Sequence, residues 1–126
     1  MMYLNELLSI PTLQELTLIN QNACLDRPVA TIESTETPDV ISYVPKNCFI
    51  ITTAMAYKEN QEKLCELILS LDKLPCAGLG IKLGRFIDEL DPKVIQTADS
   101  VGFPLINIPI HLTLGEVYHR FLSLLW

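Results

Sequence analysis

The sequence predicts one α/β domain, in which helices cover both faces of a mostly parallel sheet. First, the 126 residues suit a single hydrophobic core. Second, apolar residues make up 49% of the chain, so that core is well supplied. Third, strand-length apolar runs alternate with amphipathic segments in the second half, as in parallel strands joined by right-handed crossovers. No repeat or linker interrupts the pattern, so we expect residues 1–126 to form one domain.

The first half is predicted to contain one short helix and three strands. "LNELLSI" places three leucines on one helical face, and Pro11 closes that helix. Residues 16–20 and 28–34 have the alternation and β-branched content of strands, and residues 34–39 have the composition of a loop. Residues 47–53 form an apolar run without polar alternation, which indicates a strand covered on both faces.

A glycine-rich stretch, "GLGIKLGRF" at residues 78–86, follows an amphipathic helix predicted over residues 58–74. A dinucleotide-binding fingerprint places its glycines after a strand, in the turn that opens a helix. Here Gly78 and Gly80 lie inside the apolar strand predicted over residues 76–83, where glycines usually mark the close approach of another element. Only Gly84 is placed for a turn, so the stretch does not predict a nucleotide site.

The last third is predicted to be helix, strand and helix. The first of these helices begins at Pro92 behind an aspartate cap and stops at Gly102, which suits a left-handed terminus. Residues 104–110 form the strand. Thr113 and Glu116 have the spacing of a capping box and open the final helix.

Charge and composition exclude several functions. Nine basic and 15 acidic residues give a net charge of −6 without a basic cluster, so we expect no direct nucleic-acid binding. No apolar run is long enough for a membrane span, and the first residues lack the features of a signal peptide. The expected location is therefore the cytoplasm.

The residues that carry chemistry in other proteins are scattered here. No P-loop, nucleophile elbow or paired Cys and His appears at a telling spacing, so we expect no enzyme, catalytic residue or cofactor. The cysteines form no CxxC pair and lie far from both histidines, which argues against a metal site and for reduced, buried thiols. These cysteines are Cys24, Cys48, Cys65 and Cys76.

Several longer motifs resemble a known family. They are "LNELLSIPTL", "STETPDVISYV", "FIITTAMAY", "LGRFIDELDPKVIQTADSVGFPLINIP" and "LGEVYHRFL". Their order resembles the N-terminal domain of bacterial transcription regulators of the purine catabolism regulator (PucR) type, from about Tyr3 to Leu122. The resemblance implies a fold related to the N-terminal domains of Mur ligases and HPr kinase, and a role in signal sensing.

The resemblance also implies a C-terminal helix-turn-helix domain, which this chain does not show, so we expect a sensory domain separate from its DNA-binding domain. Two features depart from the family pattern, at three positions. Asn47 and Cys48 replace a Gly-Glu pair, and Ala54 replaces a glycine. Asn47 can adopt the left-handed conformation, but Ala54 cannot do so cheaply, so we expect the loop after Thr53 to differ.

A candidate ligand site follows from the α/β pattern, because ligands bind beyond the carboxyl ends of parallel strands. Those ends supply Thr52, Thr53, Gly84 and Arg85, and Glu36 follows an earlier strand. Two hydroxyls and a guanidinium there would suit a small polar or anionic metabolite. The alternative is that both threonines only fill strand positions and that Arg85 pairs with a nearby acidic residue, Asp88 or Glu89.

A second hypothesis for the function is a ligand-free dimerisation or docking module of the same kind of regulator. The apolar end "FLSLLW" is expected to form an exposed helix that would favour a homodimer.

Overall fold

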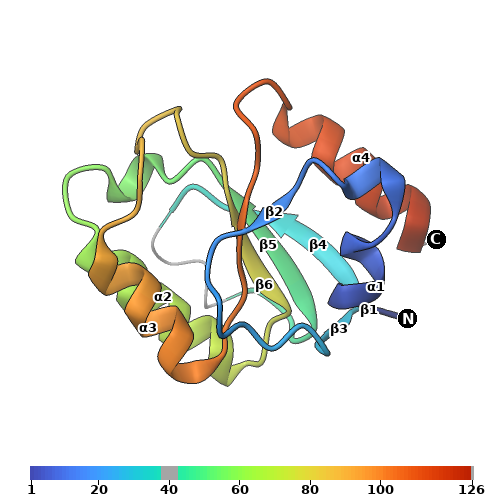
Figure 1. Cartoon of the computed structure of the whole chain (residues 1–126), viewed down its shortest axis with the longest axis horizontal. Helices are drawn as coiled ribbons and strands as arrows, with labels where there is room; N and C mark the ends of the chain where they lie inside the picture. Colours follow the sequence, from blue (N-terminus) through green and yellow to red (C-terminus); the bar gives the residue numbers. More distant parts are fainter. Residues whose placement is uncertain (38–42, 126) are drawn as a thin grey trace.

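The computed structural model describes residues 1–37 and 43–125 (Figure 1). The elements, with η for 3-10 helices, are β1 (Met2–Tyr3), α1 (Leu4–Leu8), η1 (Pro11–Leu13), β2 (Thr17–Leu18), β3 (Pro28–Val29), β4 (Thr31–Ser34), β5 (Cys48–Thr52), η3 (Met55–Tyr57), α2 (Glu62–Lys73), β6 (Gly78–Ile81), α3 (Pro92–Val101), β7 (Leu105–Asn107) and α4 (Leu114–Leu125).

A five-stranded sheet in the order β2-β7-β6-β5-β4 forms the centre of the domain. Strands β4, β5, β6 and β7 run parallel to one another, and the outermost strand β2 pairs antiparallel with β7. Strands β1 and β3 form a separate antiparallel pair. The predicted mostly parallel α/β sheet is therefore confirmed.

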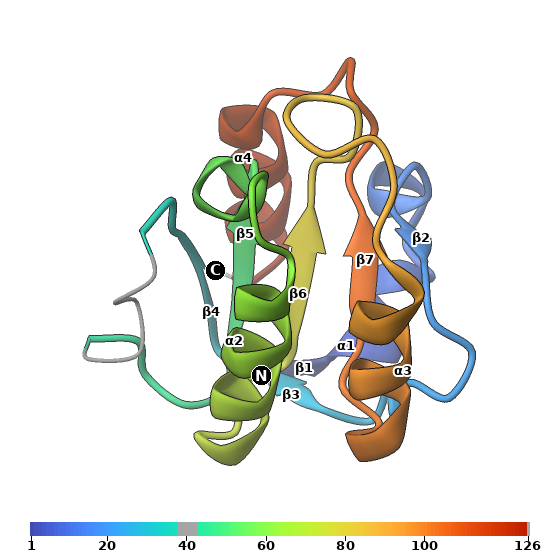
Figure 2. The ribbon, with the colours of Figure 1, turned by 90° about the vertical axis from the view of Figure 1, so that its left-hand side faces the viewer.

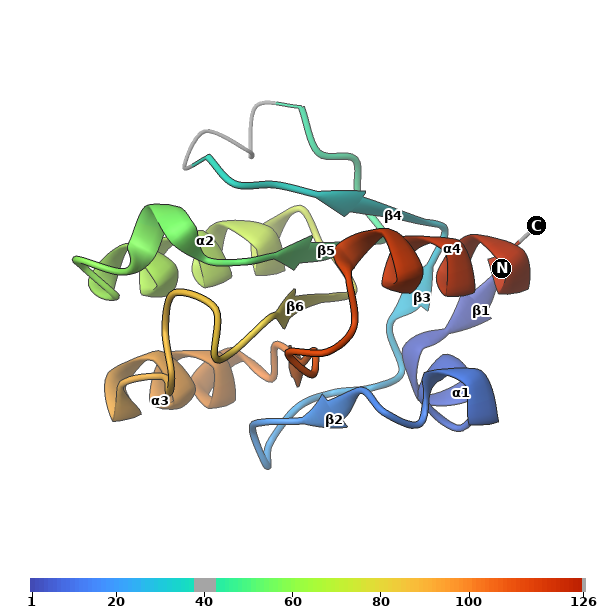
Figure 3. The same ribbon diagram turned by 90° about the horizontal axis from the view of Figure 1, so that it is seen from above.

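Helices cover both faces of the sheet, as predicted. Alternate residues of β5 point to opposite faces, so Ile50 joins the apolar cluster beneath α2 and α3. Phe49 and Ile51 join the cluster beneath α1 and α4. Figure 2 shows α2 and α3 in front of the strands, and Figure 3 shows α1 and α4 on the opposite side. Every residue of β5 is buried, which explains why its sequence lacks polar alternation.

The glycines of β6 make room for an aromatic ring, as the sequence predicts for glycines inside a strand. A Cβ on Gly78 would lie 3.2 Å from Phe49 Cε1, and one on Gly80 would lie 3.2 Å from Phe49 Cε2. The Phe49 ring, which is fully buried, stacks on Phe121 of α4 with centroids 4.9 Å apart. This stack joins α4 to the sheet.

Helix ends follow the predicted signals with one exception. The Thr113 hydroxyl accepts the Glu116 N–H at 3.0 Å and the Glu116 carboxylate accepts the Thr113 N–H at 3.2 Å, which completes the predicted capping box. Gly102 ends α3 in the left-handed conformation, with φ of +68°. Asp91 holds the N-cap position of α3, but its side chain donates and accepts no capping bond.

Several predicted boundaries are too wide. The strand predicted over 28–34 is divided into β3 and β4, and the strand predicted over 16–20 is only two residues long. The helix predicted from residue 58 begins at Glu62, because η3 and a turn precede it. The loop predicted over 34–39 extends beyond the described residues.

The prediction that the C-terminal helix is exposed is wrong for the part of it that the structure describes. Phe121 is fully buried, and three leucines after it pack half-buried against the cluster beneath α1 and α4. These are Leu122, Leu124 and Leu125. Trp126 lies outside the described residues. Within the described chain, no helix has the length and apolar character that a membrane crossing requires.

Candidate functional site

The carboxyl ends of β4, β5 and β6 lie side by side at one edge of the sheet. In register, Ser34 is opposite Ile51, and Thr52 is opposite Ile81. The pairing continues one residue further, because the Lys82 N–H donates to the Thr52 carbonyl at 3.0 Å. The predicted arrangement of β5 and β6 as adjacent parallel strands is confirmed, so the segments that follow them begin at the same edge.

Three of the predicted site residues are joined by hydrogen bonds. The Thr52 hydroxyl donates to Glu36 Oε1 at 2.9 Å. The Thr53 backbone N–H donates to both oxygens of that carboxylate, at 3.1 and 3.0 Å. Thr52 is fully buried and Glu36 is half-buried, so the carboxylate closes the end of β5. Thr52 therefore does more than fill a strand position.

The turn after Thr53 is left-handed at Ala54, where φ is +67° and ψ is 21°. The sequence-based expectation that an alanine would avoid this conformation is therefore wrong for Ala54, whereas Asn47 adopts it as expected, with φ of +61°. Such a conformation costs a residue with a Cβ about 1–2 kcal/mol. The Ala54 N–H donates to Thr52 Oγ1 at 3.0 Å and its carbonyl accepts the Tyr57 N–H at 3.0 Å, which holds the turn.

Tyr57 is a polar residue at this edge that the sequence analysis did not single out. Its side chain is only 2% exposed, and its hydroxyl makes no hydrogen bond to any described residue. Burial, and to a lesser degree the negative charge of Glu36, raise the pKa of Tyr57. It belongs to the cluster beneath α2 and α3, on the face to which alternation directs Thr52. The only feature of the sequence that could have indicated Tyr57 is its position three residues after Ala54, in the segment that follows β5.

Gly84 and Arg85 lie in a tight turn beyond β6. Gly84 has φ of +96°, and its N–H donates to the Ile87 carbonyl at 2.8 Å. Arg85 is exposed, with its guanidinium carbon 4.3 Å from the centroid of the Phe86 ring. Within residues 1–37 and 43–125, Arg85 forms no ion pair, so neither the pairing with nearby acidic residues nor a bond to the Glu36 carboxylate is seen.

The comparisons with known proteins identify the family. The purine catabolism regulatory protein-like family matches residues 6–125. The chain belongs to this family. It is also 35% identical over 118 residues to the purine catabolism regulatory protein of Bacillus subtilis (strain 168), an alignment that covers 94% of this chain and 22% of that protein. The chain thus spans about a fifth of its relative's length. No solved structure matches significantly.

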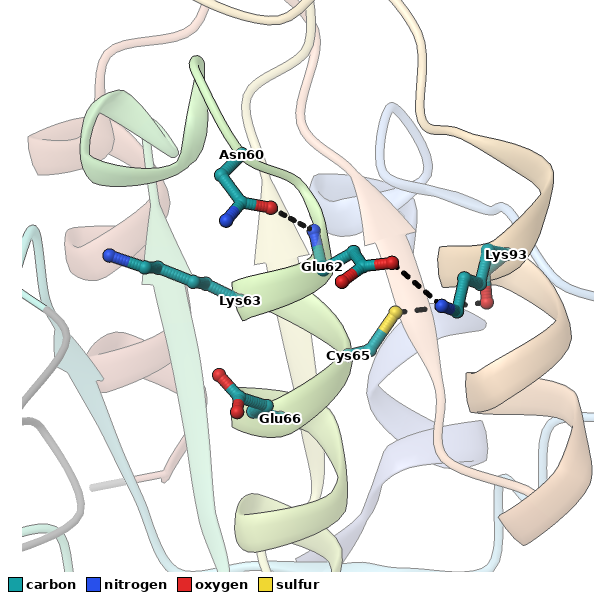
Figure 4. Close-up of a pocket in the computed structure, with 6 residues that line it drawn as sticks. All are labelled: Asn60, Glu62, Lys63, Cys65, Glu66 and Lys93. Atoms are coloured by element: carbon teal, nitrogen blue, oxygen red, sulfur yellow. Dashed lines mark hydrogen bonds and ion pairs between the residues drawn. The ribbon is translucent and has the colours of Figure 1, made fainter.

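A hollow away from these strand ends lies between α2 and α3 (Figure 4). Its volume is about 430 Å³. Lys93 Nζ lies 2.7 Å from Glu62 Oε1, and the Glu62 N–H donates to Asn60 Oδ1 at 3.0 Å. Because these groups are exposed and already paired with one another, the hollow is a weaker candidate than the edge of the sheet. Its lining residues are Asn60, Glu62, Lys63, Cys65, Glu66 and Lys93.

The remaining polar and thiol groups suggest structural roles. Burial raises the pKa of Cys48 to about 12 and that of Cys76 to about 11, so these thiols stay protonated and unreactive at neutral pH. All four cysteines are free, but the prediction that all of them are buried is wrong for Cys24, which is exposed. In the part of the chain that the structure describes, no three His, Cys, Asp or Glu residues are grouped to hold a metal ion.

Proposed function

We propose that this chain is the signal-sensing domain of a bacterial transcription regulator of purine or related nitrogen catabolism, and that it binds a small polar or anionic metabolite. The family and the name of the Bacillus subtilis relative support the regulatory role. The observation that carries the ligand proposal is the polar cluster of Glu36, Thr52 and Thr53 at the carboxyl ends of parallel strands. In open α/β sheets, ligands bind at this edge.

The proposed role requires neither catalysis nor DNA contact by this domain. We propose that Gly84 and Arg85 complete the binding edge, with the exposed guanidinium of Arg85 facing an anionic group of the metabolite. A charge-assisted hydrogen bond contributes about 1.5–3 kcal/mol, so its loss should weaken binding roughly tenfold or more. The net charge of −6 leaves DNA contact to another part of the regulator.

Thermal denaturation of the chain with a panel of purines and their breakdown products tests the proposal. A ligand at about 100 times its Kd stabilises the folded state by about 2.7 kcal/mol, which should raise Tm by roughly 10 °C. Arg85→Ala should reduce the affinity, whereas Lys63→Ala on the outer surface of α2 should not. If no compound shifts Tm, the ligand-free dimerisation or docking module becomes the better proposal.

A further inference from the structure

We propose that the end of β5 is a carboxylate-binding site that Glu36 occupies from within the chain, and that the ligand replaces Glu36 with a carboxylate of its own. This inference rests on the proposed function for the location of the site. It goes further by naming the chemical class of the ligand, a small molecule that carries a carboxylate.

The donors that hold Glu36 are fixed by the fold independently of Glu36. The Thr53 N–H lies at the end of a strand, 3.0 and 3.1 Å from the two carboxylate oxygens. The Thr52 hydroxyl, 2.9 Å from Oε1, is oriented by the Ala54 N–H that it accepts. Because preorganised donors lose little entropy when they bind, any carboxylate of suitable size can use the same two groups.

Glu36 lies where the pairing of β4 with β5 ends. It lies two residues beyond the end of β4, and Thr35 is the last residue before it to bond to β5, through the Ile51 carbonyl at 3.0 Å. No lysine or arginine of the described chain pairs with the Glu36 carboxylate. One carboxylate can therefore replace the other without breaking an ion pair.

Three polar side chains that follow β5 or β6 have no hydrogen-bond or ion-pair partner within the described chain. The Tyr57 hydroxyl is buried without a hydrogen-bond partner among the described residues, so it can donate to a ligand. Lys82 and Arg85, which follow β6 at the same edge, also form no ion pairs within the described chain. A ligand anion that reached these two cations and this hydroxyl would gain contacts that Glu36 does not make among the described residues.

Replacement would also explain how binding becomes a signal. Glu36 joins the segment after β4 to the end of β5 through its side chain. A ligand carboxylate on Thr52 and Thr53 would break these hydrogen bonds to Glu36, so occupancy of the site is coupled to the position of the Glu36 side chain.

Acetate provides the test, because it has the carboxylate of the Glu36 side chain and only one further carbon. Glu36→Ala empties the donors, and sodium acetate should then raise the Tm of this variant by about 3 °C more than it raises that of the wild type. Sodium chloride at equal ionic strength and acetamide, the neutral isostere, should not reproduce the difference. Glu33→Ala, a matched loss of charge on β4, should respond to acetate like the wild type.

An equal acetate response in Glu36→Ala and Glu33→Ala, or an equal response to acetamide, would overturn the proposal. If Glu36→Ala does not fold, Glu36→Gln retains the shape and removes the competing charge. Acetate should then shift the Thr53 amide resonance of Glu36→Gln in a saturable way, and an unmoved resonance would equally reject the site. The two experiments fail independently. If acetate has no effect, the carboxylate site is rejected, but the proposed sensing function stands with a ligand that lacks a carboxylate. If no purine compound raises the Tm, the sensing function is rejected, but a positive acetate result still shows the carboxylate site.

Discussion

Substituting Gly80 by alanine should destabilise the domain, because the strand has no room for a Cβ. That atom would lie 3.0 Å from Ile108 Cδ1 and 3.2 Å from both Ile51 Cγ2 and Phe49 Cε2. All three neighbours are fully buried. Phe49 cannot withdraw without losing its stack on Phe121.

The expected magnitude follows from two opposing effects. Overpacking a core costs about 1–3 kcal/mol. In the opposite direction, replacing glycine by alanine lowers the conformational entropy of the unfolded chain, which stabilises the fold by about 0.4–1 kcal/mol. Because all three close contacts are with fully buried side chains, the overpacking cost should lie in the upper half of its range, so the net loss in the free energy of unfolding should be about 1–2 kcal/mol, which corresponds to a fall in Tm of roughly 3–8 °C.

Urea unfolding at 25 °C measures this loss, and Gly115→Ala is the matched control. A Cβ on Gly115 would meet only Thr113 Oγ1, at 3.8 Å, on the exposed side of α4, so this variant should gain about 0.5–1 kcal/mol. If Gly80→Ala is as stable as the wild type, these glycines do not serve packing, and the case against a nucleotide-binding loop weakens.

Three further predictions concern the thiols and a buried cation. At pH 8, Cys24 alone should react quickly with a thiol reagent, since the other cysteines are buried, and Cys24→Ser should abolish the fast phase; a second fast thiol would contradict this. The free energy of unfolding in urea should fall as pH rises from about 9 towards 11, because folded Cys48 and Cys76 retain protons that the unfolded thiols release near pH 9.0. If Cys48→Ala loses stability with pH as steeply as the wild type, this cause is refuted. Arg27→Ala should cost about 2–3 kcal/mol in denaturant titrations, since the Arg27 side chain is 15% exposed and its guanidinium bonds to Asp72 at 2.7 Å and to the Cys76 carbonyl at 3.0 Å; a loss no larger than that of an exposed arginine would argue against this role.

The architecture could be predicted from sequence because its signals are local. The uninterrupted apolar run of β5, the glycines inside β6 and the box of Thr113 and Glu116 each have a direct physical reading, and the structure bears out all three. Element lengths were less predictable, because the pairing partner decides where a strand ends. β2, for example, is limited to two residues by its short contact with β7.

The candidate site was predictable only in part. The carboxyl ends of adjacent parallel strands lie at the same edge of a sheet, which places Thr52 and Thr53 there, and Glu36 follows the neighbouring strand. The left-handed Ala54 was not predictable, because tertiary hydrogen bonds hold it against its own preference. Tyr57 was missed because burial of its hydroxyl depends on contacts distant in sequence. The dimer and the ligand remain predictions.

The most direct test of ligand sensing at this edge is an NMR titration of the isotope-labelled chain with any compound that raises its Tm. If a ligand binds at this edge, the backbone amides of Thr53, Ala54 and residues 82–85 should shift most, and Arg85→Ala should weaken the response roughly tenfold. Shifts concentrated instead around Lys63 and Lys93, in the hollow between α2 and α3, would contradict it.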